Sequence, residues 1–471
     1  MHRTPLMTAA VSVAASLLAA CSSAGVSGTS PAPVAVGPLS SRLLSERSGR
    51  AATMPKNVIV IVQENRTVDN LFQFFPGANT VNKGPTHNGG TQMLQPISMD
   101  TAMDCGHFHG NFVTELNGGA QNGFDLESCS GSAPPLAAYS YVPQKEVQPY
   151  YDLAAQYTFA NNVMQPNEGP SFPGHIYLIA GQTGDGFSTG VPGDWYVADN
   201  GPFSQSGCNF TTKDVPQINM ALPYPGLPEG NKIAPCIDPP TVLSELDKAG
   251  VSWKWYTPST SIIWTSPYAI KTLYNNDKAK VIVPETTILT DIMGGVKGNK
   301  LAQLSFVVPT GHNSDHPGKG NDGGPGWVCS IVNTLGASTY WNQSAVIVVW
   351  DDWGGFYDHV PARHPATNPG DPMNSSDPYE YGFRVPLLAI GPTAKLAYIG
   401  PHARDSTAIT HFIEDIFGVG SLNKLDAQTD DLFNLFNFGG PLHQHKPVNC
   451  GPITIQGLLM ERPDPQPVDS E

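Results

Sequence analysis

Three short apolar runs in this chain are each followed directly by polar side chains. The first run, Val58–Val62, contains only valine and isoleucine, and it leads into Glu64 and Asn65. A continuous β-branched run without polar alternation is typical of a parallel strand that is covered on both faces. Ligands of parallel sheets bind outside the carboxyl ends of the strands. We therefore expect Glu64 and Asn65 to lie at a binding site.

The same arrangement occurs twice more in the second half of the chain. The run Ala345–Trp350 is followed at once by Asp351 and Asp352, and Leu304–Val308 leads into a polar segment that contains His316. Each run is again long enough for one buried strand. Because the carboxyl ends of parallel strands meet at one edge of a sheet, these side chains should gather there.

Four carboxylates follow these three runs: Glu64, Asp315, Asp351 and Asp352. Adjacent acids repel one another and are costly at a desolvated strand end, so a positive group should compensate them. Oxygen ligands favour a hard or borderline divalent cation. An acid pair after a strand can also solvate a loop or cap a helix. The convergence of several polar strand ends favours one divalent metal ion, whose identity the residues leave open.

Helical and extended patterns alternate along the chain. Amphipathic spacing predicts helices over 150–157, 241–249 and 408–417, and the patterns of 251–256 and 384–390 predict further strands. This alternation predicts an α/β fold with a mostly parallel central sheet flanked by helices.

Two stretches interrupt the pattern and should form loop-rich cap insertions over the site. They lie around residues 75–145, where Gly and Asn are frequent, and around 185–240, which is rich in Pro and Gly. Such compositions are typical of surface loops. We expect the segments 104–109 and 117–124 to be ordered loops with no strands.

One serine, Ser171, stands directly after Gly169 and Pro170 and just before an apolar stretch that predicts a helix. A hydroxyl at the start of a helix faces unpaired amides and the positive end of the helix dipole, where an anion is stabilised. Most serines in such a setting are helix N-caps. The local sequence leaves both interpretations open.

The composition restricts the possible functions. The chain has 471 residues, of which 40% are hydrophobic, so it can bury a full core. Its formal net charge of -15 argues against a nonspecific nucleic-acid binder, which needs a basic surface. No nucleic-acid partner is therefore expected, and a phosphate-bearing substrate would depend on the local charge of metal and histidine.

The N-terminal region resembles a bacterial lipoprotein signal. Residues 1–20 combine a basic start with an apolar run too short to span a membrane, and they end in L-A-A before Cys21. This arrangement resembles a lipobox, in which Cys21 is lipidated; an ordinary signal peptide that happens to contain a cysteine is the alternative. We expect an exported lipoprotein anchored to a membrane on the periplasmic or cell-surface side. Residues 21–54 would form a flexible tether, 55–440 the catalytic domain and 441–471 a C-terminal tail.

Six cysteines remain after Cys21, and an even number in an exported chain predicts disulfide bonds. Six cysteines allow 15 connectivities. The simplest pairs join near neighbours: Cys105 with Cys129, Cys208 with Cys236, and, as the remaining pair, Cys329 with Cys450.

Several motifs follow one another in a fixed order: Q-E-N-R-T-V-D-N, D-C-G-H, N-G-G-A-Q-N-G-F, G-P-S-F-P-G-H, V-V-P-T-G-H-N-S-D-H-P and W-D-D-W-G-G-F-Y-D-H-V. From about Lys56 to about Gly420, the chain thereby resembles the bacterial phosphoesterase family that contains phospholipases C and a class of acid phosphatases. That family belongs to the alkaline phosphatase superfamily, so the resemblance implies an alkaline phosphatase-like fold.

The resemblance also implies a role for each matching residue. The metal ligands would be Glu64, Asn65, Asp351 and Asp352, and the nucleophile would be Ser171. Phosphoryl oxygens or the leaving group would be assisted by His107 and His316. A further histidine, His359, matches the pattern and either contacts substrate or is structural.

The expected activity is metal-dependent hydrolysis of a phosphoric ester, phospholipase C-like or acid phosphatase-like. The substrate would be a phosphate ester or a phospholipid, and serine at the nucleophile position leans toward the phosphatase type. A sulfatase-related hydrolase is an alternative, although the segment after Ser171 lacks the arginine of the sulfatase signature. A noncatalytic surface lipoprotein that binds a ligand on the same scaffold is another.

Overall fold

The structure is a computed structural model that describes residues 54–184, 195–201, 207–219, 229–294, 300–318, 320–362, 381–423, 426–427 and 429–461. The predicted signal sequence and Cys21 lie outside these residues, so lipidation and export stay predictions. None of the helices in the described ranges combines the length and the apolar character needed to cross a bilayer.

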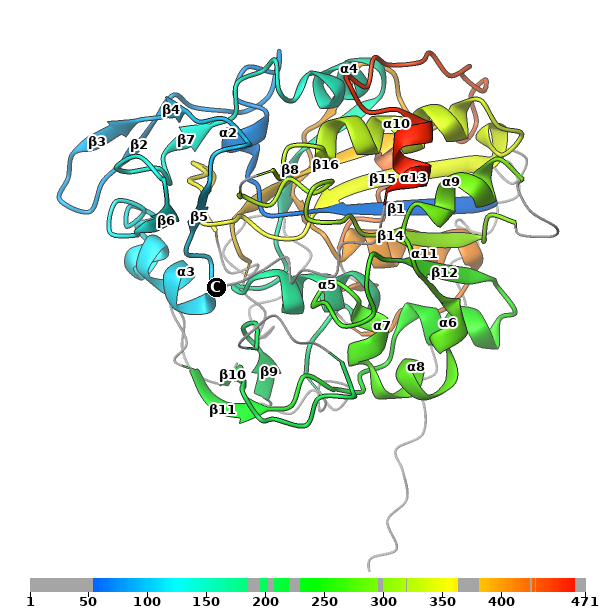
Figure 1. Ribbon diagram of the computed structural model, residues 1–471, viewed down its shortest axis with the longest axis horizontal. Coiled ribbons are helices and arrows are strands. Elements are labelled where there is room, and N and C mark those ends of the chain that lie inside the picture. Colours follow the sequence, from blue (N-terminus) through cyan, green and yellow to red (C-terminus); the bar gives the residue numbers. More distant parts are fainter. Residues whose placement is uncertain are drawn as a thin grey trace, which may run out of the picture. The chain divides into compact units, whose positions relative to one another are not determined.

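Within the described residues, nine strands form one central sheet (Figure 1). Their order is β13 (Val281–Ile282), β12 (Trp253–Tyr256), β14 (Leu304–Val307), β1 (Asn57–Gln63), β15 (Ser344–Trp350), β16 (Arg384–Ile390), β8 (Thr158–Met164) and β17 (Tyr398–Gly400), with β18 (Arg404–Asp405) beside β8. Strand β16 is antiparallel to both of its neighbours, while the other pairings are parallel. The predicted α/β class with a mostly parallel sheet is confirmed.

Helices cover both faces of this sheet (Figure 1). One face carries α4 (Gln148–Gln156), α9 (Thr287–Ile292), α10 (Gly324–Gly336) and α13 (Ile455–Met460), and the other carries α5 (Ser171–Ala180), α6 (Val242–Lys248), α7 (Ser266–Ala269) and α11 (Ala408–Phe417). The described part of the chain also contains α8 (Lys271–Asn276) and 3-10 helices at Asn117–Gly119, Lys278–Lys280, Trp341–Gln343 and Phe433–Leu435.

Strands β1 and β15 form the centre of the core, because their apolar side chains are buried on both faces. The two strands pair in parallel over seven residue pairs, from Asn57 opposite Ser344 to Gln63 opposite Trp350. Both strands therefore end at the same level. The residues that follow them, Glu64 and Asp351, start from neighbouring positions at one edge of the sheet.

The region around 75–145 contains short strands, and one of them, β5, includes Asp104 and Cys105, so the expectation that the segment 104–109 has no strand was wrong. The segment 117–124 has no strand, as expected. Three small two-stranded sheets are formed by β2 (Lys83–Pro85) with β3 (Thr91–Met93), β4 (Gln95–Pro96) with β7 (Ser140–Tyr141), and β5 (Met103–Cys105) with β6 (Cys129–Gly131). Two helices flank them, α2 (Val68–Leu71) and α3 (His109–Leu116). A three-stranded sheet of β9 (Trp195–Val197), β10 (Val215–Asn219) and β11 (Glu229–Ile233) lies in the second predicted insertion.

Three disulfide bonds join the cysteines in the simplest predicted pairing: Cys105–Cys129, Cys208–Cys236 and Cys329–Cys450. The first connects β5 to β6, directly beside His107. The last fastens the segment after residue 440 to α10.

Three buried carboxyl groups predict that the protein loses stability as the pH rises. Burial raises the pKa of Glu285 from 4.5 to about 7, that of Asp315 from 3.8 to about 7 and that of Asp405 from 3.8 to about 6. Between about pH 4 and 7 the folded state therefore binds more protons than the unfolded state, and stability falls through this window. In EDTA, the midpoint of thermal unfolding should drop by several degrees from pH 5 to pH 8, since one pKa unit corresponds to about 1.4 kcal/mol.

The matched variant for this prediction is Glu285→Gln, which keeps the side-chain volume but cannot ionise. Its unfolding midpoint should depend less on pH than that of the wild type. A midpoint that is the same at pH 5 and pH 8, or an equal slope in the variant, would contradict the prediction.

Candidate active site

The residues after β1 and β15 are buried and contact each other. The backbone N–H of Asn65 donates to Asp351 Oδ1 at 3.0 Å, and its side-chain Nδ2 donates to Asp352 Oδ2 at 3.3 Å. Glu64, Asn65 and Asp352 have no exposed surface, and Asp351 is 3% exposed. An acid pair that merely solvates a loop would be exposed, so this alternative does not hold for Asp351 and Asp352.

A glycine allows the two loops to approach so closely. Asn65 adopts a left-handed backbone conformation with φ of 58°, and Gly354 does the same with φ of 60°. A Cβ atom at Gly354 would lie only 2.2 Å from the carbonyl oxygen of Asn65. The motif W-D-D-W-G-G thus provides the acids of the site and also the glycine that the close approach to Asn65 requires.

Ser171 is the first residue of α5, and Pro170 occupies the N-cap position. Its Oγ lies 3.1 Å from Asp352 Oδ2 and 3.3 Å from Glu64 Oε2. The serine is therefore not the N-cap of this helix. Its hydroxyl proton points to a carboxylate, which is the arrangement of an oxygen nucleophile beside a potential base.

Two amides in the first turn of α5 are engaged within the protein. The N–H of Phe172 donates to Asn200 Oδ1 at 2.9 Å, and that of Gly174 donates to the carbonyl of Pro170 at 3.1 Å. These two amides are therefore not available to an anion beside Ser171 unless their present hydrogen bonds break.

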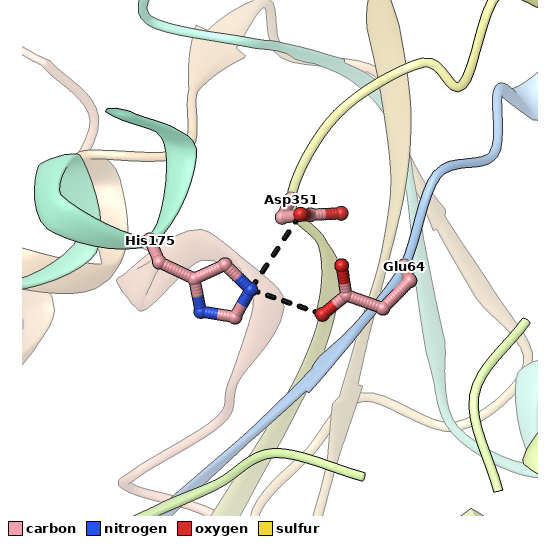
Figure 2. Close-up of side chains that lie close together, drawn as sticks. All are labelled: Glu64, His175 and Asp351. Carbon is pink, nitrogen blue, oxygen red and sulfur yellow. Dashed lines mark hydrogen bonds and ion pairs between the residues drawn. The ribbon is translucent and has the colours of Figure 1, made fainter. Parts of the chain in front are cut away.

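His175 lies one helical turn after Ser171 and joins the same group of residues (Figure 2). Its Nε2 is 3.0 Å from Glu64 Oε1 and 3.5 Å from Asp351 Oδ2. This histidine is not among the predicted site residues. Its signal was present, because residues four apart share one face of a helix.

The charge balance at this centre is set by His175 and the acids. Burial on its own raises the pKa of Asp351, but the hydrogen bond and positive charge of His175, together with contacts to Glu64 and Ser171, lower this pKa to about 2. Asp351 is thus ionised at neutral pH. The centre contains three carboxylates and one imidazole, which contacts two of them, so negative charge is left to be compensated.

The donor atoms fit a divalent cation. One ligand atom each of Glu64, His175 and Asp351 lies within 4.8 Å of the others. In addition, Asn65 Oδ1 is buried and accepts no hydrogen bond from the described residues. Buried oxygen atoms in this state are costly unless they bind a donor or a metal. A mixed set of oxygen and imidazole ligands suits a hard or borderline metal ion.

Two further predicted histidines lie beside this group. His107 Nε2 is 2.9 Å from Asn65 Nδ2, and its Nδ1 donates to the carbonyl of Cys105 at 2.8 Å. This pattern makes Nε2 the acceptor of the Asn65 amide. The ring of His316 lies 5.7 Å from that of His107, measured between centroids, and His316 is 2% exposed.

The remaining predicted histidine, His359, lies in a different cluster. Its Nδ1 is 2.8 Å from Asp69 Oδ2, and its Nε2 is 3.2 Å from Asn79 Oδ1. Arg384 pairs with Asp358 at 2.9 Å in the same cluster, so a guanidinium already supplies positive charge there. Among its described contacts, His359 touches neither Ser171 nor the four predicted metal ligands, and these contacts favour the structural alternative.

Comparison with known proteins gives a consistent picture. The profile described as the Phosphoesterase family matches residues 55–420. A non-hemolytic phospholipase C of Pseudomonas aeruginosa is 22% identical over 370 residues, covering 70% of this chain and 48% of that protein. Phospholipase C B of Mycobacterium tuberculosis is 29% identical over 228 residues, covering 43% of this chain and 44% of that protein. The chain thus spans about half the length of these two relatives.

Among solved structures, a protein in the alkaline phosphatase superfamily from Vibrio parahaemolyticus aligns with a TM-score of 0.34. The alignment has 10% sequence identity and covers 78% of this chain and 67% of that one.

Proposed function

The chain belongs to the Phosphoesterase family, and on that premise we propose that it is a metal-dependent phosphoric ester hydrolase with Ser171 as its nucleophile. The observation that carries the proposal is the position of the Ser171 hydroxyl within 3.3 Å of two buried carboxylates, Glu64 and Asp352. Attack of an oxygen nucleophile on phosphorus requires such a base and a positive environment for the phosphoryl oxygens.

The resident metal ion would be held by Glu64, Asn65, Asp351 and Asp352, as the family resemblance implies, together with His175. Bound there, a divalent cation would supply positive charge to the phosphoryl oxygens and lower the pKa of the serine hydroxyl. The buried oxygen of Asn65 that lacks a hydrogen-bond partner among the described residues supports this ligand set.

The chain's own residues account for the remaining chemistry. The Ser171 hydroxyl gives its proton to a neighbouring carboxylate, its oxygen bonds to phosphorus, and the bond between phosphorus and the leaving alcohol breaks. The departing oxygen needs a proton, which we assign to His316, because His107 Nε2 accepts a hydrogen bond from Asn65. Water then hydrolyses the phosphoserine and restores the enzyme.

The substrate would be a phosphate ester or a phospholipid. The two relatives named above are called phospholipases C, which supports a phosphodiester with a lipid alcohol. Serine as the nucleophile supports a phosphomonoester instead. Neither argument outweighs the other, so the experiment has to include both classes.

Hydrolysis can be tested with p-nitrophenyl phosphate, p-nitrophenyl phosphorylcholine, phosphatidylcholine vesicles and p-nitrophenyl sulfate. We expect turnover of at least one phosphoric ester, loss of this turnover after dialysis against EDTA, and recovery when a divalent metal such as Mn²⁺ is added. Turnover of the sulfate ester alone would favour a sulfatase. Binding without turnover of any ester, at full metal occupancy, would favour a noncatalytic protein and contradict the proposal.

A further inference from the structure

The residues that directly precede the site residues form a connected buried layer. Trp350, which precedes Asp351, donates through Nε1 to Asp315 Oδ2 at 2.9 Å. Gln63, which precedes Glu64, accepts from the backbone N–H of Asp315 at 2.9 Å. Asp315 itself precedes His316, so one residue connects the ends of β1, β14 and β15.

Two further contacts tie Asp315 to its surroundings. The hydroxyl of Tyr150 on α4 donates to the same Oδ2 atom at 2.8 Å, and Arg66 Nε donates to the backbone carbonyl of Asp315 at 2.7 Å. Gln63 also donates through Nε2 to the carbonyl of Asn313 at 2.9 Å. The loop after β14 is therefore held through both its backbone and its side chain.

This layer is fully buried and closely packed. Asp315, Gln63, Trp350 and Tyr150 have no exposed surface. A Cβ atom at Gly324, the first residue of α10, would lie 2.0 Å from Asp315 Oδ1 and 3.1 Å from Gln63 Nε2. Hydrogen bonds to a carboxyl group in such a buried, low-dielectric environment are strong and geometrically restrictive. Asp315 can thus fix the relative positions of three loops that carry site residues.

We propose that Asp315 is a positioning residue of the active site, which aligns His316 with the acids after β1 and β15 through Gln63 and Trp350. Asp315 makes none of the described contacts with Ser171 or with the proposed metal ligands, so it acts through its neighbours. The expected effect on kcat rests on the proposed function, whereas the expected effect on Mn²⁺ binding rests only on the proposed metal site. These two parts can therefore be tested separately.

The test uses the full protein and two variants, Asp315→Asn and Tyr150→Phe. For Asp315→Asn we expect kcat to fall roughly 10-fold with little change in KM, and the Kd of Mn²⁺, measured by calorimetry, to rise roughly 10-fold, as is typical when a residue behind a metal ligand is changed. Tyr150→Phe keeps the carboxylate and removes one hydrogen bond to it. It should shift kcat and the Mn²⁺ affinity in the same direction by a smaller factor.

The matched control is Glu414→Gln on α11. Glu414 is also a buried carboxyl group, it bonds to the backbone of Leu422, and burial raises its pKa to about 11, so that glutamine resembles its neutral form. This variant should keep the wild-type kcat and Mn²⁺ affinity. If Glu414→Gln changes only the stability of the fold, kcat and Mn²⁺ affinity should remain at their wild-type values at temperatures well below unfolding.

Each possible result of these measurements either supports or contradicts the positioning role of Asp315. Wild-type kcat and Mn²⁺ affinity in Asp315→Asn would overturn the proposal, and so would a loss in Asp315→Asn with wild-type behaviour in Tyr150→Phe, since that result would point to charge rather than position. If the protein hydrolyses no ester, the Mn²⁺ titrations still test the positioning role while the proposed function fails. If Asp315→Asn does not fold, Tyr150→Phe decides alone by the same two readouts.

Discussion

Replacing Ser171 by alanine should lower kcat for the best phosphoric ester substrate by about 10³-fold or more, while fold and metal content stay unchanged. The loss is large because the covalent route disappears and only positioning and electrostatic assistance remain. The cavity left by one hydroxyl is small, so the buried site should keep its structure. Steady-state kinetics, a thermal unfolding curve and metal analysis of the same sample measure the three quantities.

The conservative variant Ser171→Thr provides the matched comparison, since it keeps the hydroxyl beside Glu64 and Asp352. It should retain far more activity than the alanine variant. A quenched reaction of the wild type should yield a phosphopeptide that contains Ser171, detectable by mass spectrometry. Phosphate on another residue, or wild-type turnover in Ser171→Ala, would replace this mechanism by direct attack of water.

The second large effect is expected at the metal site. Glu64→Gln should weaken Mn²⁺ binding by more than the roughly 10- to 100-fold that is typical for residues behind a metal ligand, and activity should fall with it. The substitution keeps the volume of the side chain but removes the charge beside His175, whose Nε2 lies 3.0 Å from Glu64 Oε1. Metal analysis after dialysis and calorimetric titration give both quantities.

A buried acid outside the site serves as the control for Glu64→Gln. Glu285 is 1% exposed and its side chain contacts none of the proposed ligands among the described contacts, so Glu285→Gln should bind Mn²⁺ as the wild type does. Unchanged metal stoichiometry in Glu64→Gln would show that Glu64 is not a ligand.

The central strands and the acids were predictable because their signal is local and strong. All side chains of the run V-I-V-I-V are apolar, so both faces of this strand need to be buried. The change to Glu64 and Asn65 directly after the run marks the edge of the sheet. Ser171 was selected as a candidate by the turn residues before it and the apolar stretch after it, and the family resemblance then implied its role as nucleophile. The direction of β16 was not predictable, because an apolar strand reads the same in either orientation.

Other features escaped prediction because their causes are not local. The strands between 83 and 141 are two or three residues long, too short to show a period of two, and β4 and β5 pair with strands that lie much later in the sequence. In the sequence, His175 resembles one more residue of an apolar helix. Only the structure shows that Glu64 and Asp351 lie opposite it. Likewise, Asp315 was counted with the site acids, although its side chain faces Tyr150 and Trp350.

The register between β1 and β15 has a consequence for the biosynthesis of the protein. Asn65 and Asp352 are 287 residues apart in sequence, and every residue between them must be synthesised before the two ends of the site can meet. A growing polypeptide therefore has no complete cation site until β15 and the residues that follow it have been synthesised. Any metal that this site binds can therefore be bound by all of its proposed ligands only after Asp351 and Asp352 have been synthesised.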